Sequence, residues 1–256
     1  MLQFFRNIRR RLLDSGSLRK YFVYAIGEIL LVVIGILIAL QVNNWNEQRK
    51  INAKEQKYLL AIKNELINNL DAISKEQARL KNALEAQGNL IALIEAESDT
   101  VSEQYLSTLI PQSFSDEIIL AYERGIFTQL LSTGGLNDIS NDSIKIQIAS
   151  WDGRVNDFRK QEEELDLYRN TITQYFIDHA DIKTMFTDPT LSAVSKDGKS
   201  KKNHSNKHLL KDQTFENFLL LYSVIGQILH DKHYPELEAN INSLLQLVEG
   251  DLNIKN

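Results

Sequence analysis

The sequence predicts an all-α protein: an N-terminal transmembrane helix continues into a long helix, and roughly four to six helices form an extramembrane bundle. Apolar residues recur at spacings of three, four and seven, which is the period of one face of a helix. The 256-residue chain has only three prolines and eleven glycines, so long intervals lack helix breakers. Strand-like alternation never persists for more than a few residues.

Composition and charge restrict the classes of function. Cysteine is absent, which excludes disulfides, thiolate metal ligands and cysteine nucleophiles. The whole chain carries −5, but residues 1–20 carry +5, so the remainder carries −10. A basic arm before an apolar segment and an acidic body is typical of a membrane protein and gives no indication of nucleic-acid binding. The basic residues of the arm are Arg6, Arg9, Arg10, Arg11, Arg19 and Lys20.

The anchor is the apolar segment over residues 21–41. About 20 helical residues cross the hydrocarbon core of a bilayer, and Tyr21, Tyr24 and Trp45 lie where aromatic side chains favour the headgroup region. A cleavable signal peptide is the alternative interpretation, but the end of the segment lacks the small residues of a cleavage site. The sequence therefore favours a retained anchor.

Basic residues also predict the orientation. Six lie within the 20 residues before the segment, and four lie in residues 42–61. The positive-inside bias then places the N-terminus in the cytoplasm. We therefore expect a single-pass inner-membrane protein with a cytoplasmic arm (1–20), a transmembrane helix (21–41) and a periplasmic helical domain (42–256).

Glu28 is the one ionisable residue in the apolar segment, and it shares a helix face with Gly35 and Ala39. Gly35 and Ala39 form a small-xxx-small pattern that lets a second helix approach closely. One interpretation is an intramembrane partner contact or proton-linked site; the other is that Glu28 bonds the headgroup zone or Tyr24. The stripe motivates a hypothesis of a protein partner or self-association through the span.

The body is predicted from its breakers and caps. Pro111 ends a short helix, Ser115-Asp116 caps the next, Thr133-Gly134-Gly135 stops it, and Lys232 to Pro235 separates the last two. Residues 182–207 are polar and basic, which predicts a flexible loop; a solvated insertion is favoured over a lipid or acidic-partner contact. The predicted helices are 46–96, 102–109, 116–131, 143–179, 209–229 and 235–248.

No motif predicts catalysis or a cofactor. The chain has no glycine-rich phosphate loop and no serine-nucleophile signature. Glu162-Glu163-Glu164 is interpreted as a solvated helical run, and no set of metal ligands is complete. We therefore expect a protein that is not an enzyme and holds no metal or cofactor.

The N-terminal third contains a characteristic set of short segments: Phe4-Phe5-Arg6, Lys20-Tyr21 and the blocks over 24–29, 33–41 and 43–47. Together with a weaker Gly134-Gly135-Leu136 turn, it resembles a domain-of-unknown-function family of single-pass membrane proteins of Gram-negative bacteria. The resemblance implies a retained anchor and implies no activity. The first hypothesis is an interaction or scaffold component of the cell envelope; the alternative is a periplasmic sensory or ligand-binding helical bundle.

Overall fold

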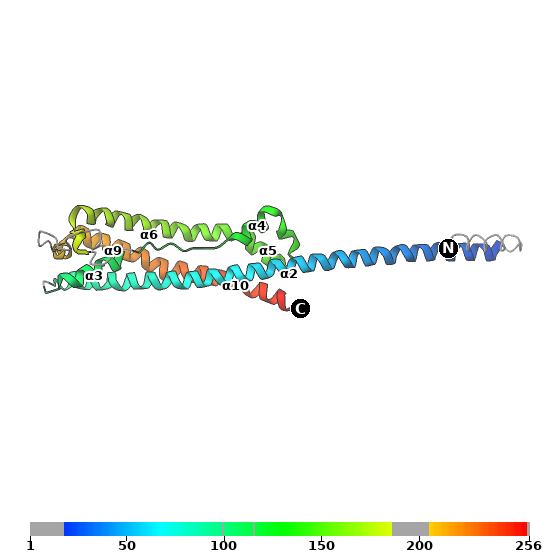
Figure 1. Ribbon diagram of the computed structural model, residues 1–256, viewed down its shortest axis with the longest axis horizontal. Helices are drawn as coiled ribbons and strands as arrows, with labels where there is room; N and C mark the ends of the chain where they lie inside the picture. Colours follow the sequence, from blue (N-terminus) through cyan, green and yellow to red (C-terminus); the bar gives the residue numbers. More distant parts are fainter. Residues whose placement is uncertain (1–17, 99, 115, 186–204, 255–256) are drawn as a thin grey trace, which may run out of the picture. The chain divides into compact units, whose positions relative to one another are not determined.

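The computed structural model describes residues 18–98, 100–114, 116–185 and 205–254 (Figure 1). Every regular element within these ranges is helical, so the all-α prediction is confirmed. The order is α2 (Leu18–Glu95), α3 (Glu103–Phe114), α4 (Gly125–Thr133), η1 (Gly135–Asp138), α5 (Asp142–Ala149), α6 (Trp151–His179), α7 (Ile182–Met185), η2 (Lys207–Lys211), α9 (Gln213–Ile228), η3 (Leu229–His233) and α10 (Tyr234–Ile254).

The chain divides into two compact units, residues 1–57 and residues 58–256. Helix α2 contributes its apolar N-terminal part to the first unit and the remainder to the second. The expected continuity between the apolar segment and a long helix is confirmed, because α2 is a single helix of 78 residues.

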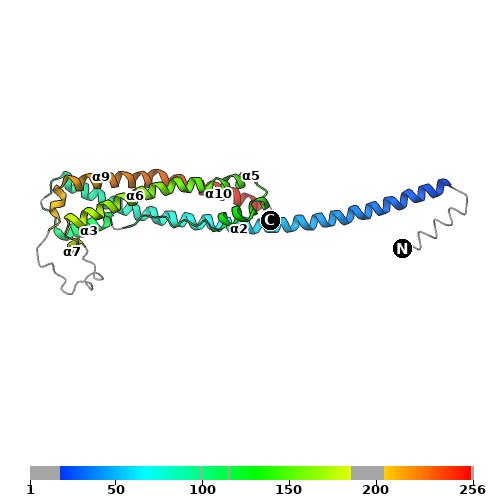
Figure 2. The same ribbon diagram turned by 90° about the horizontal axis from the view of Figure 1, so that it is seen from above.

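Three long rods form the second unit: the C-terminal part of α2, α5 with α6, and α9 with α10 (Figures 1 and 2). Lys63 Nζ of α2 lies 2.7 Å from a Glu249 carboxylate oxygen, and Ser223 Oγ donates to Gln87 Oε1 at 2.8 Å. These pairs show that α9 and α10 run antiparallel to α2. The core between the rods includes Leu66, Leu80, Trp151, Leu165, Leu219 and Leu244, all nearly inaccessible to solvent.

Helices α9 and α10 are joined without interruption by η3, where a break was predicted. The buried residues of this rod step by four, three, four and three from Phe215 to Leu229, and the next buried residue, Tyr234, comes five positions later. A step of five exceeds one α-helical turn, and the π-helical segment η3 absorbs the extra residue. The predicted separation before Pro235 is therefore wrong: the core faces of α9 and α10 stay aligned through η3.

Residues 116–124, which we call the strap, are not helical, and this differs from a second prediction. A helix was expected from residue 116, but helix α4 begins only at Gly125. Burial alternates along the strap: Glu117 and Ile119 are exposed, and Ile118 and Leu120 are buried. The strap returns alongside α2 and α6 between α3 and α4 (Figure 1). Nine extended residues cover about 30 Å, whereas nine helical residues would cover only about 14 Å.

Two other helix boundaries differ from those predicted. Helix α3 continues past Pro111 to Phe114 instead of ending there. The predicted long helix before His179 is interrupted at Ser150, which separates α5 from α6.

The predicted flexible loop over 182–207 is wrong at both ends. Residues Ile182–Met185 form α7, and Met185 is buried. Asn206 is only 1% exposed. Residues 186–204 lie outside the described residues.

Candidate functional site

The apolar part of α2 exposes its side chains throughout. Every Val, Leu, Ile and Phe between Phe22 and Val42 is at least 43% exposed. Among the described residues, α2 is the one helix long and apolar enough to cross a membrane. Contiguous apolar surface of this size marks contact with lipid or with another protein.

The stripe expected from the sequence lies on this part of α2. At about 100° per residue, Glu28, Gly35 and Ala39 fall within an arc of about 40°. Gly35 and Ala39 are exposed and Glu28 is half-buried. A Cβ built on Gly35 would meet nothing within 4 Å, so no packing among the described residues requires a glycine there. Among the described residues, the Tyr24 hydroxyl has no hydrogen-bond partner, so it makes no bond to Glu28.

The other predicted anchor residues are only partly described. Trp45 is exposed on α2, and Tyr24 is half-buried. Arg19 is exposed, and Lys20 and Tyr21 belong to the first turns of the same helix. Arg6, Arg9, Arg10 and Arg11 lie outside the described residues.

In the second unit, the strap is held mainly by side chains that sequence reasoning did not single out. Asn69 of α2 is completely buried; its Oδ1 accepts from the Glu123 amide and its Nδ2 donates to the Glu123 carbonyl, both at 2.8 Å. Glu65, one turn earlier, accepts from the Ile126 amide at 2.8 Å. That amide lies in the first turn of α4, where Arg124 provides no side-chain cap, so Glu65 caps α4 from another helix.

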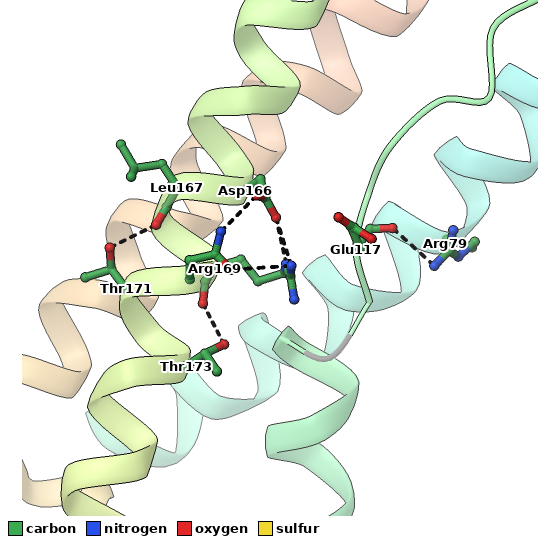
Figure 3. A network of polar contacts seen from close by, with 8 residues as sticks. Arg79, Glu117, Asp166, Leu167, Arg169, Thr171 and Thr173 are labelled. Carbon is green, nitrogen blue, oxygen red and sulfur yellow. Dashed lines mark hydrogen bonds and ion pairs between the residues drawn. The ribbon is translucent and has the colours of Figure 1, made fainter.

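The other end of the strap is held in the same way. Arg79 of α2 donates to the Glu117 carbonyl at 3.3 Å (Figure 3), and its second nitrogen bonds Glu76. Gln87 donates to the Ser113 carbonyl at 2.9 Å at the end of α3. Polar side chains of α2 thus satisfy backbone groups that an isolated extended segment would leave unpaired.

Glu162 of α6 holds the middle of the strap. It is 2% exposed; its Oε1 accepts from the Leu120 amide at 2.6 Å and its Oε2 accepts from Arg159 at 2.7 Å. Burial raises the pKa of Glu162 to about 7, although both hydrogen-bond partners oppose the shift. Burial also raises the pKa of Glu65. The prediction of a solvated glutamate run is wrong for Glu162 and holds for the exposed Glu163 and Glu164.

The missed residues carried a detectable signal. Polar side chains occupy core-facing positions of α2, interleaved with leucines and isoleucines. A polar residue at a buried helical position needs a partner, and an extended neighbouring segment provides one. In the part of α2 that belongs to the second unit, the buried polar residues are Glu65, Asn69, Glu76 and Gln87.

Two cavities adjoin α3. A polar cavity of about 590 Å³ lies between α2 and α3 and is lined by residues such as Arg79, Asn89 and Gln112. An apolar cavity of about 370 Å³ lies among α3, α6 and α7. Its one charged lining residue, Arg169, is paired with Asp166 at 2.9 Å (Figure 3). The apolar lining is Ile110, Pro111, Phe114, Phe176, Ile177, Ile182 and Met185.

The arrangement of the strap holds a segment in place rather than presenting a reactive group, because Glu65 accepts from the Ile126 amide and Glu162 accepts from the Leu120 amide and Arg159. Within the described residues, no group of three or more His, Cys, Asp and Glu side chains could hold a metal ion.

Comparison with known protein families gives a match over about half of the chain. The model of a family described as "Family of unknown function (DUF6090)" matches residues 28–163. The matched range begins at Glu28 and includes the strap and the side chains that hold it, through Glu162. No curated protein and no solved structure matches the chain.

Proposed function

The chain belongs to the family of unknown function DUF6090, and on that premise we propose that it is a membrane-anchored interaction or scaffold protein of the bacterial cell envelope. Its N-terminus lies in the cytoplasm, residues 21–41 cross the inner membrane, and the helical domain occupies the periplasm. It acts by binding other proteins and catalyses no reaction. The observation that carries the proposal is the exposure of every Val, Leu, Ile and Phe side chain from Phe22 to Val42.

Physical reasoning supports the anchor. In water, about 20 exposed apolar residues would promote aggregation, whereas in a bilayer their side chains contact the apolar hydrocarbon core. The backbone polar groups of this segment are bonded within α2, as lipid requires. Lysine and arginine are more frequent before the segment than after it, which favours a cytoplasmic N-terminus.

Topology is tested by cysteine labelling, which suits a chain without cysteine. Ser17→Cys lies before the apolar segment, and Ser132→Cys lies at an exposed position of α4. A membrane-impermeant maleimide that reaches the periplasm of intact cells should label Ser132→Cys and spare Ser17→Cys until the inner membrane is permeabilised. The opposite pattern would reverse the orientation, and recovery of the chain in the soluble fraction would refute the anchor.

The partner contact is assigned to Glu28, Gly35 and Ala39. Gly35→Leu places a large side chain on the stripe, and Glu28→Leu removes its carboxyl. Gly27→Leu is the matched control, because Gly27 lies about 80–120° away from the stripe and also has open space around its Cβ position. We expect Gly35→Leu and Glu28→Leu to reduce crosslinking in native membranes and Gly27→Leu to leave it unchanged. Equal crosslinking in all variants would contradict the assignment.

The apolar cavity favours a second candidate function, a ligand-binding bundle. Pockets of roughly 300–1,000 Å³ with apolar walls and few polar groups are typical of small-molecule sites, and this cavity has about 370 Å³. Saturable thermal stabilisation by a small molecule would support binding. Thr173→Trp should occlude the cavity and abolish the stabilisation, whereas Thr171→Trp, on the same helix but outside the lining, should not. Stabilisation that survives Thr173→Trp would place the ligand elsewhere.

A further inference from the structure

His208 of η2 makes a pair of hydrogen bonds that one charge state alone permits. Its Nδ1 lies 2.8 Å from the Ser205 carbonyl oxygen, and its Nε2 lies 2.8 Å from the His179 carbonyl oxygen. Carbonyl oxygens accept hydrogen bonds and cannot donate them. A neutral imidazole has one N–H and one lone pair, so it can bond only one of these oxygens. The imidazolium donates from both nitrogens and satisfies both.

The position of the second oxygen also favours a cation. His179 is the last residue of α6, and its carbonyl belongs to the last turn, where helical carbonyls lack partners along the helix. The negative end of the helix dipole lies at this terminus and stabilises a nearby positive charge.

Hydrogen bonds that do not depend on the charge of His208 hold the same junction. The Asn206 side chain accepts from the Asp181 amide at 2.8 Å and donates to Thr184 Oγ1 at 2.7 Å. The Glu103 carboxylate of α3 accepts from Ser205 Oγ and from the Asn206 amide at 2.6 and 2.8 Å. When His208 is neutral, the junction therefore stays assembled but loses one of the two His208 hydrogen bonds.

We propose that His208 is a proton-dependent clasp that, as an imidazolium, ties the C-terminal end of α6 to the turn entering η2. The clasped state holds a proton that the released state gives up. Falling pH therefore favours the clasp, and rising pH releases it. Phe176 and Ile177 of α6 and Ile182 of α7 line the apolar cavity, so the clasp fixes one end of its walls.

The acidic groups on the adjoining elements are already engaged. Besides Glu103, the Asp181 carboxylate accepts from the Lys183 amide, and Asp212 accepts from the Thr214 amide at the start of α9. The other titratable groups near the junction on these elements are Tyr175, Asp178 and His179 of α6, Lys183 of α7, and Lys207 and Lys211 of η2; the Asp178 carboxylate accepts from Gln174. His179 directs its Nδ1 to the Tyr175 carbonyl of its own helix, so its proton does not join the two elements.

Hydrogen exchange of the full chain in detergent micelles tests the clasp. After correction for intrinsic exchange, peptides covering 176–184 and 205–212 should exchange about fivefold faster at pH 8 than at pH 5.5, because an exposed charged hydrogen bond is lost. His208→Gln retains one donor nitrogen but cannot gain a proton, so its exchange should be the same at both pH values and match the wild type at pH 8.

Two further variants serve as controls. His179→Gln removes the other histidine at the junction, and His230→Gln removes one in η3; both should keep the pH response. A wild-type exchange rate independent of pH would overturn the proposal, as would a pH response that persists in His208→Gln. Imidazole nitrogen NMR gives a second test: one unprotonated His208 nitrogen at pH 5.5 would overturn the proposal.

Discussion

Asn69 offers the most direct test of how the strap is held. Replacing Asn69 with Leu keeps a side chain of similar size but removes both hydrogen bonds to Glu123. Each buried backbone group left without a partner costs about 1–3 kcal/mol. The strap is only partly covered, so water can compensate in part, and we expect a loss of about 2–3 kcal/mol. For a chain of this size that corresponds to a fall in Tm of about 5–10 °C.

Denaturant and thermal unfolding of the full chain in detergent measure this loss. Asn68→Leu is the matched control, since exposed Asn68 bonds only the Glu123 side chain and should stay within about 0.5 kcal/mol of the wild type. Exchange of the Leu120 and Glu123 amides should accelerate in Asn69→Leu alone. Equal stability of the two variants would refute the view that buried side chains of α2 hold the strap.

Three further predictions concern the second unit. The pKa of Glu162 rises from 4.5 to about 7 on folding. The stabilisation that follows from this shift is fully present below pH 4.5 and is lost as pH rises through 7. Glu162→Gln should remove this pH dependence of the free energy of unfolding, up to about 3 kcal/mol, when unfolding is measured from pH 4 to 8. Gly226→Val should destabilise by about 1–3 kcal/mol in the same assay, because a Cβ would lie 3.2 Å from Leu84 Cδ2, whereas Gly88→Ala, in open space, should stabilise by about 0.5–1 kcal/mol. Glu65→Ala should cost about 1 kcal/mol and speed amide exchange in the first turn of α4, and unchanged exchange there would contradict the cap.

Helical periodicity predicted the long elements well because their burial repeats with the helix. Leu59, Ile62, Leu66 and Ile73 follow these spacings within the helix predicted over 46–96, and all four are buried. The class of fold and the continuity of α2 followed from this pattern. The strap could not be predicted in the same way, because Ile118, Ile119 and Tyr122 are also compatible with helical spacing. Its conformation is set by the distance it must cover and by partners on α2 and α6.

Site residues could be predicted where local composition reveals them, and could not where their partners are distant in the sequence. The apolar segment was visible from composition alone, and the structure places its side chains in the open. Glu162 looked like a surface residue because Glu163 and Glu164 follow it, and only the three-dimensional position of Leu120 shows that it faces inward. His208 gave no local signal, since the carbonyl it reaches at His179 lies 29 residues earlier.

The π-helical segment η3 separates two properties that are normally linked in a helix: its length and the direction its side chains face. One added residue in an α-helix rotates everything after it by about 100°. Here the wide turn confines that rotation to Leu229–His233. Removing one residue from this turn would leave both faces aligned and draw α10 back by about 1.5 Å, toward α9. The Lys63–Glu249 and Asn141–Asp251 pairs and the buried side chains of α10 would all shift by that distance, while the buried face kept its direction.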